Sequence, residues 1–161
     1  MANTPKKDPI NPTDDDARQL ARDLIQQARF AALGVIDPQT GGPMVTRVAL
    51  VPGPGGAPLS LISELSAHTT ALTANPTCSL LIGEPGAKGD PLTHPRLTLQ
   101  AEAKNCHKLD LREHYLGLYP KAQLYFDFAD FVLFRFMPTA GLLNGGFGKA
   151  YRLLPHDVLP L

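Results

Sequence analysis

The 161-residue sequence has no tryptophan and only two cysteines. Cys78 and Cys106 lack Cys-x-x-Cys spacing, which argues against a zinc site or a redox disulfide. Basic and acidic residues balance at fifteen each. No overall field therefore favours nucleic acid or an anionic membrane surface as a partner.

Long apolar runs are also missing. No stretch reaches the roughly 18–20 residues of a membrane-spanning helix, and the N-terminal MANTPKKDPINPTDDD lacks the apolar segment of a secretory signal. We therefore expect a cytoplasmic protein. The length predicts one domain. Residues 1–12, polar and carrying three prolines, are expected to form a flexible arm, and residues 13–161 the domain.

What the chain does contain is a series of short apolar segments separated by turns, in keeping with its 16 prolines and 14 glycines. Strands are predicted at 30–37, 44–51, 57–63, 78–84, 96–105 and 128–138, with a seventh within 142–155. Helices are predicted at 14–29, 67–74 and 107–119, the first capped by Thr13. The pattern predicts a mainly β fold, a small barrel of six to seven antiparallel strands with helices between them.

Polar side chains gather where the third strand passes to the second helix, in LSLISELSAHTTALTANP (59–76). Hydroxyls and His68 surround a predicted helix start, where unpaired N–H groups readily bind an anion. A meander of the second and third strands is expected to bring Arg47 close, and a guanidinium binds phosphate well. The plainer interpretation is that the hydroxyls cap the helix and Arg47 is solvated or paired with a carboxylate. The pattern alone favours the plainer one.

The order of three segments resembles the FMN-binding split-barrel family, which includes the pyridoxamine 5′-phosphate oxidases. The segments are TRVAL (46–50), LISELSAHTTALTANPTCSLLIGEP (61–85) and PRLTLQAEA (95–103). The pattern S-x-L-x-x-H-T-x-x-L, which starts at Ser63, and the closing GGFGKAYRL (145–153) resemble the haem-iron-utilisation branch of that family. The similarity extends over about residues 14–155.

This resemblance implies a homodimeric split barrel with two FMN molecules at the subunit interface. The phosphate would lie on Arg47 and the turn after the third strand, the flavin ring along the backbone of the second strand, and partner contacts near the fifth strand and the glycine-rich segment. The implied cofactor-binding residues are Thr46, Arg47, Val48, Ala49, Leu50, Ser63, Ser66, Ala67, His68, Thr69, Arg96, Gly146 and Lys149. The oxidase branch has an Arg-Lys pair where this chain has Ala67 and His68, which leaves less fixed positive charge.

The expected activity is flavin-dependent oxidation or reduction of a small molecule, with no side chain assigned as a catalytic acid or base. One alternative is a haem-binding or haem-degrading protein on the same barrel. Another is a flavin-binding or interaction protein without turnover. No metal site is expected, because no His-x-x-x-His or His-Glu-x-x-His spacing occurs.

Overall fold

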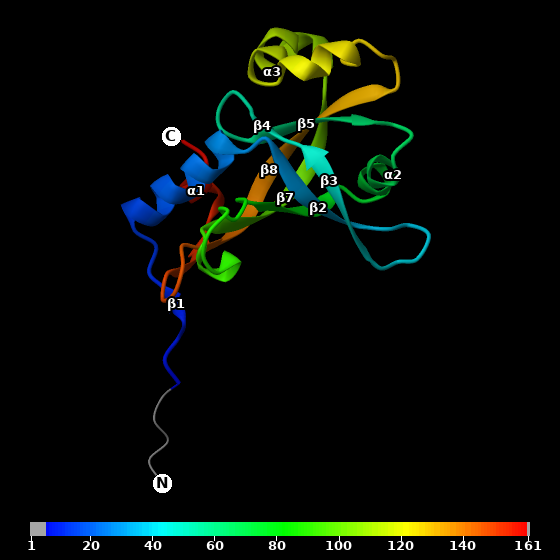
Figure 1. The fold of residues 1–161 in the computed structure, drawn as a ribbon. Helices are drawn as coiled ribbons and strands as arrows, with labels where there is room; N and C mark the ends of the chain where they lie inside the picture. The colour runs from blue at the N-terminus through cyan, green and yellow to red at the C-terminus, as the bar shows by residue number, and fades with distance from the viewer. Residues whose placement is uncertain (1–5, 161) are drawn as a thin grey trace.

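Seven antiparallel strands of four or more residues dominate the computed structural model, which describes residues 6–160 (Figure 1). They are β2 (Phe30–Ile36), β3 (Pro43–Ala49), β5 (Pro58–Ser63), β6 (Thr77–Ile82), β7 (Arg96–Cys106), β8 (Phe131–Asn144) and β9 (Ala150–Leu153). The hydrogen-bonded order is β9-β8-β7-β6-β2-β3, and β5 pairs with the first part of β8. Two-residue strands, β1 (Ile10–Asn11) and β4 (Val51–Pro52), extend the sheet. The predicted mainly β fold is confirmed.

Two features of the sheet differ from the sequence prediction. The expected meander is wrong at its third strand, because β5 pairs with β8 and not with β3. The strand expected to end at Pro138 continues to Asn144. A register shift opposite Gln100 and Ala101 accommodates the proline. Proline is tolerated inside a sheet mainly at such bulges, because it cannot donate to the ladder.

The main core fills the inside of the barrel and is closed by α1 (Asp15–Gln27). Ala17, Ala21 and Ile25 of this helix are buried with the inward side chains of the strands. Asp14, and not the expected Thr13, caps the helix, because its Oδ1 accepts from the Ala17 amide at 2.8 Å. The negative charge at this end of the helix also suits the positive end of its dipole.

A second core packs helices against the outside of β5 and β8 (Figure 1). It is built by α3 (Arg112–Leu118) and short 3₁₀ turns at Lys108–Leu111 and Pro120–Leu124, which replace the single helix expected over 107–119. Tyr115 and Phe126 are fully buried there. The Tyr115 hydroxyl accepts a hydrogen bond from the Leu61 amide of β5 at 3.2 Å, which joins the two layers.

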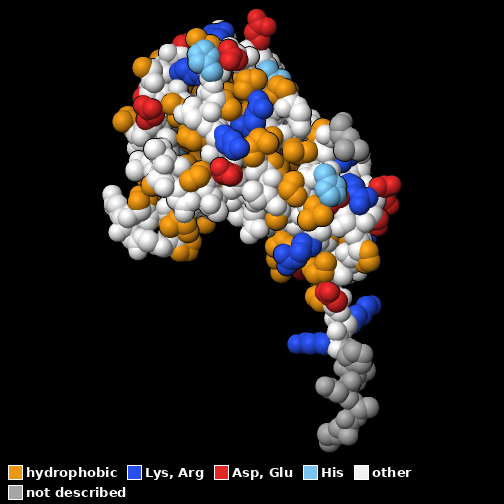
Figure 2. Space-filling model, turned by 180° about the vertical axis from the view of Figure 1, so that it is seen from behind, with side chains coloured by type: hydrophobic (Ala, Val, Ile, Leu, Met, Phe, Trp, Pro, Cys, Tyr) orange, Lys and Arg blue, Asp and Glu red, His pale blue; other side chains and the backbone are white. Residues whose placement is uncertain are grey.

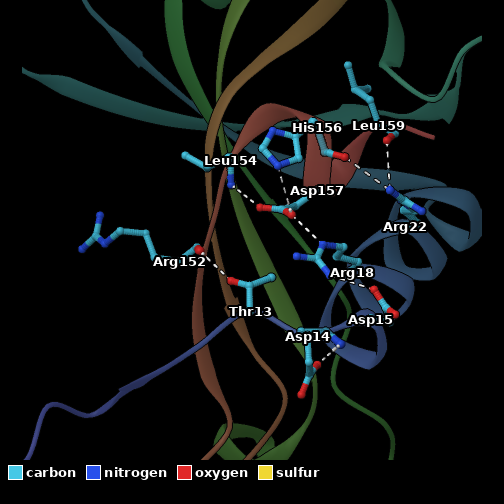
Figure 3. A network of polar contacts seen from close by, with 11 residues as sticks. Thr13, Asp14, Asp15, Arg18, Arg22, Arg152, Leu154, His156, Asp157 and Leu159 are labelled. Atoms are coloured by element: carbon cyan, nitrogen blue, oxygen red, sulfur yellow. Dashed lines mark hydrogen bonds and ion pairs between the residues drawn. The ribbon is translucent and has the colours of Figure 1, made fainter. Parts of the chain in front are cut away.

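The C-terminal segment is fastened to α1 through Asp157, a buried carboxylate in α4 (Pro155–Val158) (Figure 3). Its oxygens accept from Arg18 Nε at 2.7 Å and from the Leu154 amide at 2.8 Å. Arg22 donates to the carbonyl oxygen of Leu159 at 3.1 Å. Side chains of the first helix thus hold the end of the described chain in place.

The proposed division into an arm and a domain stays a prediction. Residues 1–5 of the arm lie outside the described residues. Ile10 and Asn11 pair in parallel with β9, and Asn11 Nδ2 donates to the Gly148 carbonyl at 2.6 Å. None of the helices between residues 6 and 160 is long and apolar enough to span a membrane.

Candidate functional site

The N-terminus of α2 (Ala67–Ala74) follows β5 through the turn that the sequence singled out. The hydroxyl groups of this turn differ in their hydrogen bonds. Thr69 donates to the Ser63 carbonyl at 2.6 Å, and Ser63 Oγ donates to Asp130 Oδ2 at 2.9 Å. Ser66 occupies the N-cap position, yet its side chain makes no capping bond.

The first amides of α2 are therefore available. Within residues 6–160, the N–H groups of Ala67 and His68 have no hydrogen-bond acceptor, and Ser66 Oγ has no partner. An eight-residue helix with free amides at its start and a hydroxyl beside them presents donors that suit an anion. The expected capping by hydroxyls is not found: Ser63 and Thr69 are used inside the turn, and the Ser66 side chain at the N-cap position makes no capping bond.

His68 joins this turn to strand β3. Its Nδ1 lies 3.0 Å from the Thr46 hydroxyl. Burial lowers the pKa of the His68 imidazole below its ordinary 6.5, so the ring is neutral near pH 7. His68 therefore offers a hydrogen-bonding nitrogen at the turn, and not a fixed positive charge.

Replacing His68 with asparagine is expected to flatten the dependence of stability on pH. The unfolded chain binds a proton on His68 more readily than the folded one, so wild-type stability falls as pH drops from 6.5 towards the lowered pKa. Urea unfolding across that window measures the slope. The exposed His107 replaced by asparagine is the matched control. Equal slopes in wild type and His68→Asn would show that His68 is not the titrating group.

Arg47 lies on the other face of β3 from Thr46, as alternation along a strand requires. Its guanidinium carbon is 5.5 Å from the centroid of the Phe30 ring. Both side chains line a hollow of about 740 Å³ beside α1, together with Leu24, Leu81 and other residues. The structure thus groups Thr46 with the α2 turn and places the Arg47 guanidinium on a different face.

The rest of the second strand is largely committed to the fold. Val48 is 5% exposed and Leu50 is fully buried. The Ala49 carbonyl accepts from Ser60 Oγ, and the Leu50 amide donates to the Arg29 carbonyl at 2.9 Å. Among the described strands only β2 forms a ladder with β3, so β3 is an edge strand beside the α2 turn.

The remaining predicted residues form a second group at the other side of the sheet. Arg96 and Gly146 line a hollow of about 570 Å³ with Leu92 and Phe147. Gly146 has φ +118°, a conformation that favours glycine. The Lys149 carbonyl closes this loop by accepting from the Gly145 amide at 2.7 Å.

Phe147 is a residue that the sequence reasoning missed. It is 84% exposed at the tip of the glycine-rich loop. An aromatic residue flanked by glycines was the available signal. Strands β2 and β6 separate β3 from β7. The first group, on β3 and α2, and the second group, at Arg96 and the loop, are therefore not assembled within one chain.

The outer face of the sheet between these groups carries mostly small side chains, with exposed Val45, Leu81 and Leu142 among polar ones. Two rows of paired residues cross strands β3, β2, β6, β7 and β8 on this face. The first row is Val45, Gly34, Ser79, Gln100 and Ala140, and the next row is Arg47, Ala32, Leu81, Thr98 and Leu142. Val45 is 68% exposed and Leu81 47%. We call these two rows the outer face. Exposed apolar side chains rimmed by polar ones are typical of a contact site.

Charges do not form a single-sign patch on the side shown in Figure 2. Lysines, arginines and acids lie in small groups among apolar side chains there. This agrees with the balanced composition. Within the described part of the chain, no group of three or more His, Cys, Asp or Glu side chains is placed to hold a metal ion.

Comparison of the sequence with protein-family models gives no match. Two named relatives are similar to this chain. The chloroplastic non-canonical haem oxygenase HOZ of Arabidopsis thaliana is 37% identical over 101 residues, which are 60% of this chain and 30% of that protein. The haem oxygenase HutZ of Vibrio cholerae is 29% identical over 149 residues, 86% of this chain and 81% of HutZ. The chain spans less than a third of the length of the Arabidopsis protein.

Solved structures share the fold. One is 45% identical with a TM-score of 0.87 and covers 92% of this chain and 99% of its own. A haem-binding protein of Mycobacterium smegmatis, 24% identical, has a TM-score of 0.80 over 92% of this chain and 61% of its own. A Clostridium acetobutylicum protein of the pyridoxine phosphate oxidase family, 16% identical, reaches 0.66 over 91% of this chain and 99% of its own. These likenesses and the strand order show that the chain has the split-barrel fold shared with proteins of the pyridoxine phosphate oxidase family, and that its sequence is similar to those of two named haem oxygenases.

Proposed function

We propose that this protein is a homodimer that binds FMN between its subunits and uses it to oxidise or reduce a small molecule. The observation that carries the proposal is the uncapped start of α2 beside the edge strand β3. The free amides of Ala67 and His68, with the Ser66 hydroxyl, supply donors of the kind that a phosphate needs.

A second subunit would complete the site. Arg96, Gly146 and the exposed Phe147 lie away from the α2 turn in one chain. The outer face between the two groups exposes Val45, Leu81 and Leu142 in the single chain. Most homodimers have two-fold symmetry, so each subunit would bring its Arg96 group to the α2 turn of the other. Burial of the outer face would supply the driving force.

The residues present suit the phosphate end of FMN better than they define a catalytic centre. Bound flavin supplies the electron transfer, and the chain binds and orients it. The α2 amides and Ser66 would hold the phosphate, and neutral His68, fixed by Thr46, would orient the turn. Arg47 would reach the phosphate only by leaving Phe30.

Haem is the second candidate cofactor, favoured by the relatives. Two of them are named haem oxygenases and one solved neighbour a haem-binding protein. Haem carries two anionic propionates on a flat ring, so the same amides would serve it. Both candidates thus share one chemistry, a planar redox ring with an anionic tail.

The test is an absorbance spectrum of the purified full chain before and after loading with FMN or haemin and desalting. Retained flavin bands support the proposal. A retained and shifted Soret band without flavin retention would replace FMN with haem. A colourless protein that releases both, and whose melting temperature neither raises, would overturn cofactor binding and leave an interaction role.

We expect the Arg47 side chain to turn from Phe30 to the phosphate when FMN binds. Replacing Arg47 with alanine should then weaken FMN binding by about 1.5–3 kcal/mol through loss of a charge-assisted contact. Fluorescence titration of FMN measures the change. Arg29→Ala is the matched control, since Arg29 lines the same hollow while its guanidinium donates to the Ala28 carbonyl. Equal affinity in wild type and Arg47→Ala would remove Arg47 from the site without affecting the α2 turn.

A further inference from the structure

Two basic side chains lie on the outward side of β7 and β8, further along β7 from the outer face. Lys104 of β7 is directly opposite Arg135 of β8. Like charges directly opposite in a sheet repel each other. No carboxylate oxygen of residues 6–160 lies within 4.0 Å of either side chain. Glu102 lies two residues before Lys104 on the same face of β7, opposite Met137, and it forms no ion pair with either side chain.

Arg135 also carries an orphaned donor. Its Nε is buried and has no hydrogen-bond partner among the described residues. A buried donor without an acceptor is rare in folded proteins, and such a donor often marks a place where an ion or a water molecule binds. An anion placed between the two side chains would relieve the repulsion, and it would reach the buried Nε only if the Arg135 side chain turned.

The space for such an anion exists. Lys104 and Arg135 line a hollow of about 420 Å³, which we call the basic groove. Its other walls are Asn105, Cys106, His107, Asp110, Leu111 and Met137. His107 Nδ1 is 3.2 Å from Asp110 Oδ1, so this one acidic wall residue is engaged with the imidazole at the rim. The groove has room for more than the anion itself.

We propose that the basic groove binds a phosphate group, either inorganic phosphate or the phosphate of a small phosphorylated metabolite. The dianion would lie between Lys104 and Arg135, accept from the terminal guanidinium nitrogens of Arg135 and from the Lys104 ammonium group, and cancel the repulsion across the strands. An arginine fork and an ammonium group together match the charge and the oxygen geometry of phosphate. This site is separate from the cofactor site and does not depend on it.

The experiment compares thermal unfolding of the full chain in phosphate and in sodium chloride of equal ionic strength. Wild type is expected to melt higher in phosphate, and Lys104→Gln to lose most of that rise. In chloride, Lys104→Gln should melt no lower than wild type, because repulsion is removed. Lys121→Gln, at an exposed site outside the groove, is the control and should behave as wild type.

Heteronuclear NMR titration locates the effect. Phosphate is expected to shift the amides of residues 104–107 and 135–137, with affinity at least about tenfold weaker in Arg135→Gln. Tighter binding of glycerol phosphate than of inorganic phosphate would assign the groove to a phosphorylated metabolite, and equal binding to phosphate itself. Equal phosphate stabilisation of wild type, Lys104→Gln and Arg135→Gln, with no localised shifts, would overturn the proposal.

Discussion

Leu81→Lys is expected to convert the proposed dimer into a monomer and to abolish retention of the proposed cofactor. Leu81 lies in the middle of the outer face and is 47% exposed in the single chain. A two-fold interface contains each residue twice, so the substitution buries two unpaired ammonium groups. The dissociation constant of the dimer should rise by at least about a hundredfold. Light scattering coupled to size exclusion measures the mass.

The monomer itself should remain folded, because Leu81 contributes little to the inner core. Leu124→Lys is the matched control, a leucine of 81% exposure placed away from the outer face. It should remain a dimer with its cofactor. Wild-type protein that is monomeric and still retains flavin or haem would contradict the two-subunit site. A dimer that Leu81→Lys leaves intact would place the interface elsewhere.

Asp157→Asn is expected to lower the free energy of unfolding at pH 7 by about 2 kcal/mol. The buried carboxylate balances Arg18 and accepts the Leu154 amide (Figure 3). Since Arg18 is about one third exposed, it can turn towards water, which keeps the loss below that of a fully buried pair. Urea unfolding measures it. Asp15→Asn is the control, because exposed Asp15 also contacts Arg18 but should change stability by less than about 0.5 kcal/mol.

The effect of Asp157→Asn should depend on pH in a defined direction. Burial raises the pKa of Asp157, but the hydrogen bonds from Leu154 and Arg18 outweigh it and hold the pKa below 3.8. The charged form therefore stabilises the fold fully above pH 3.8 and progressively less as the pH falls through the lowered value. The difference in the free energy of unfolding between wild type and Asp157→Asn should become smaller in that acid range. A difference that is constant with pH would show that packing, and not charge, is lost.

Local sequence patterns determined most of the secondary structure. Alternating apolar residues and turn signals located seven strands, because a strand that buries one face must alternate. The helix over 67–74 was predicted with its observed limits, since a polar turn starts it and Asn75-Pro76 ends it. Where prediction failed, a long-range contact was responsible. Proline cannot donate a hydrogen bond to the ladder, so Pro138 predicts the end of a strand. The bulge against β7 allows β8 to continue past it.

The sequence also identified candidate anion-binding residues, because Ser66, the residues that start α2 and the arginines are visible in it. Only the tertiary structure decided how they are arranged. Strand order put β5 against β8, and alternation turned Arg47 away from His68. Sheet register set Lys104 opposite Arg135. Hydrophobic periodicity fixes which face of an element is buried, whereas strand pairing between distant segments fixes which side chains meet.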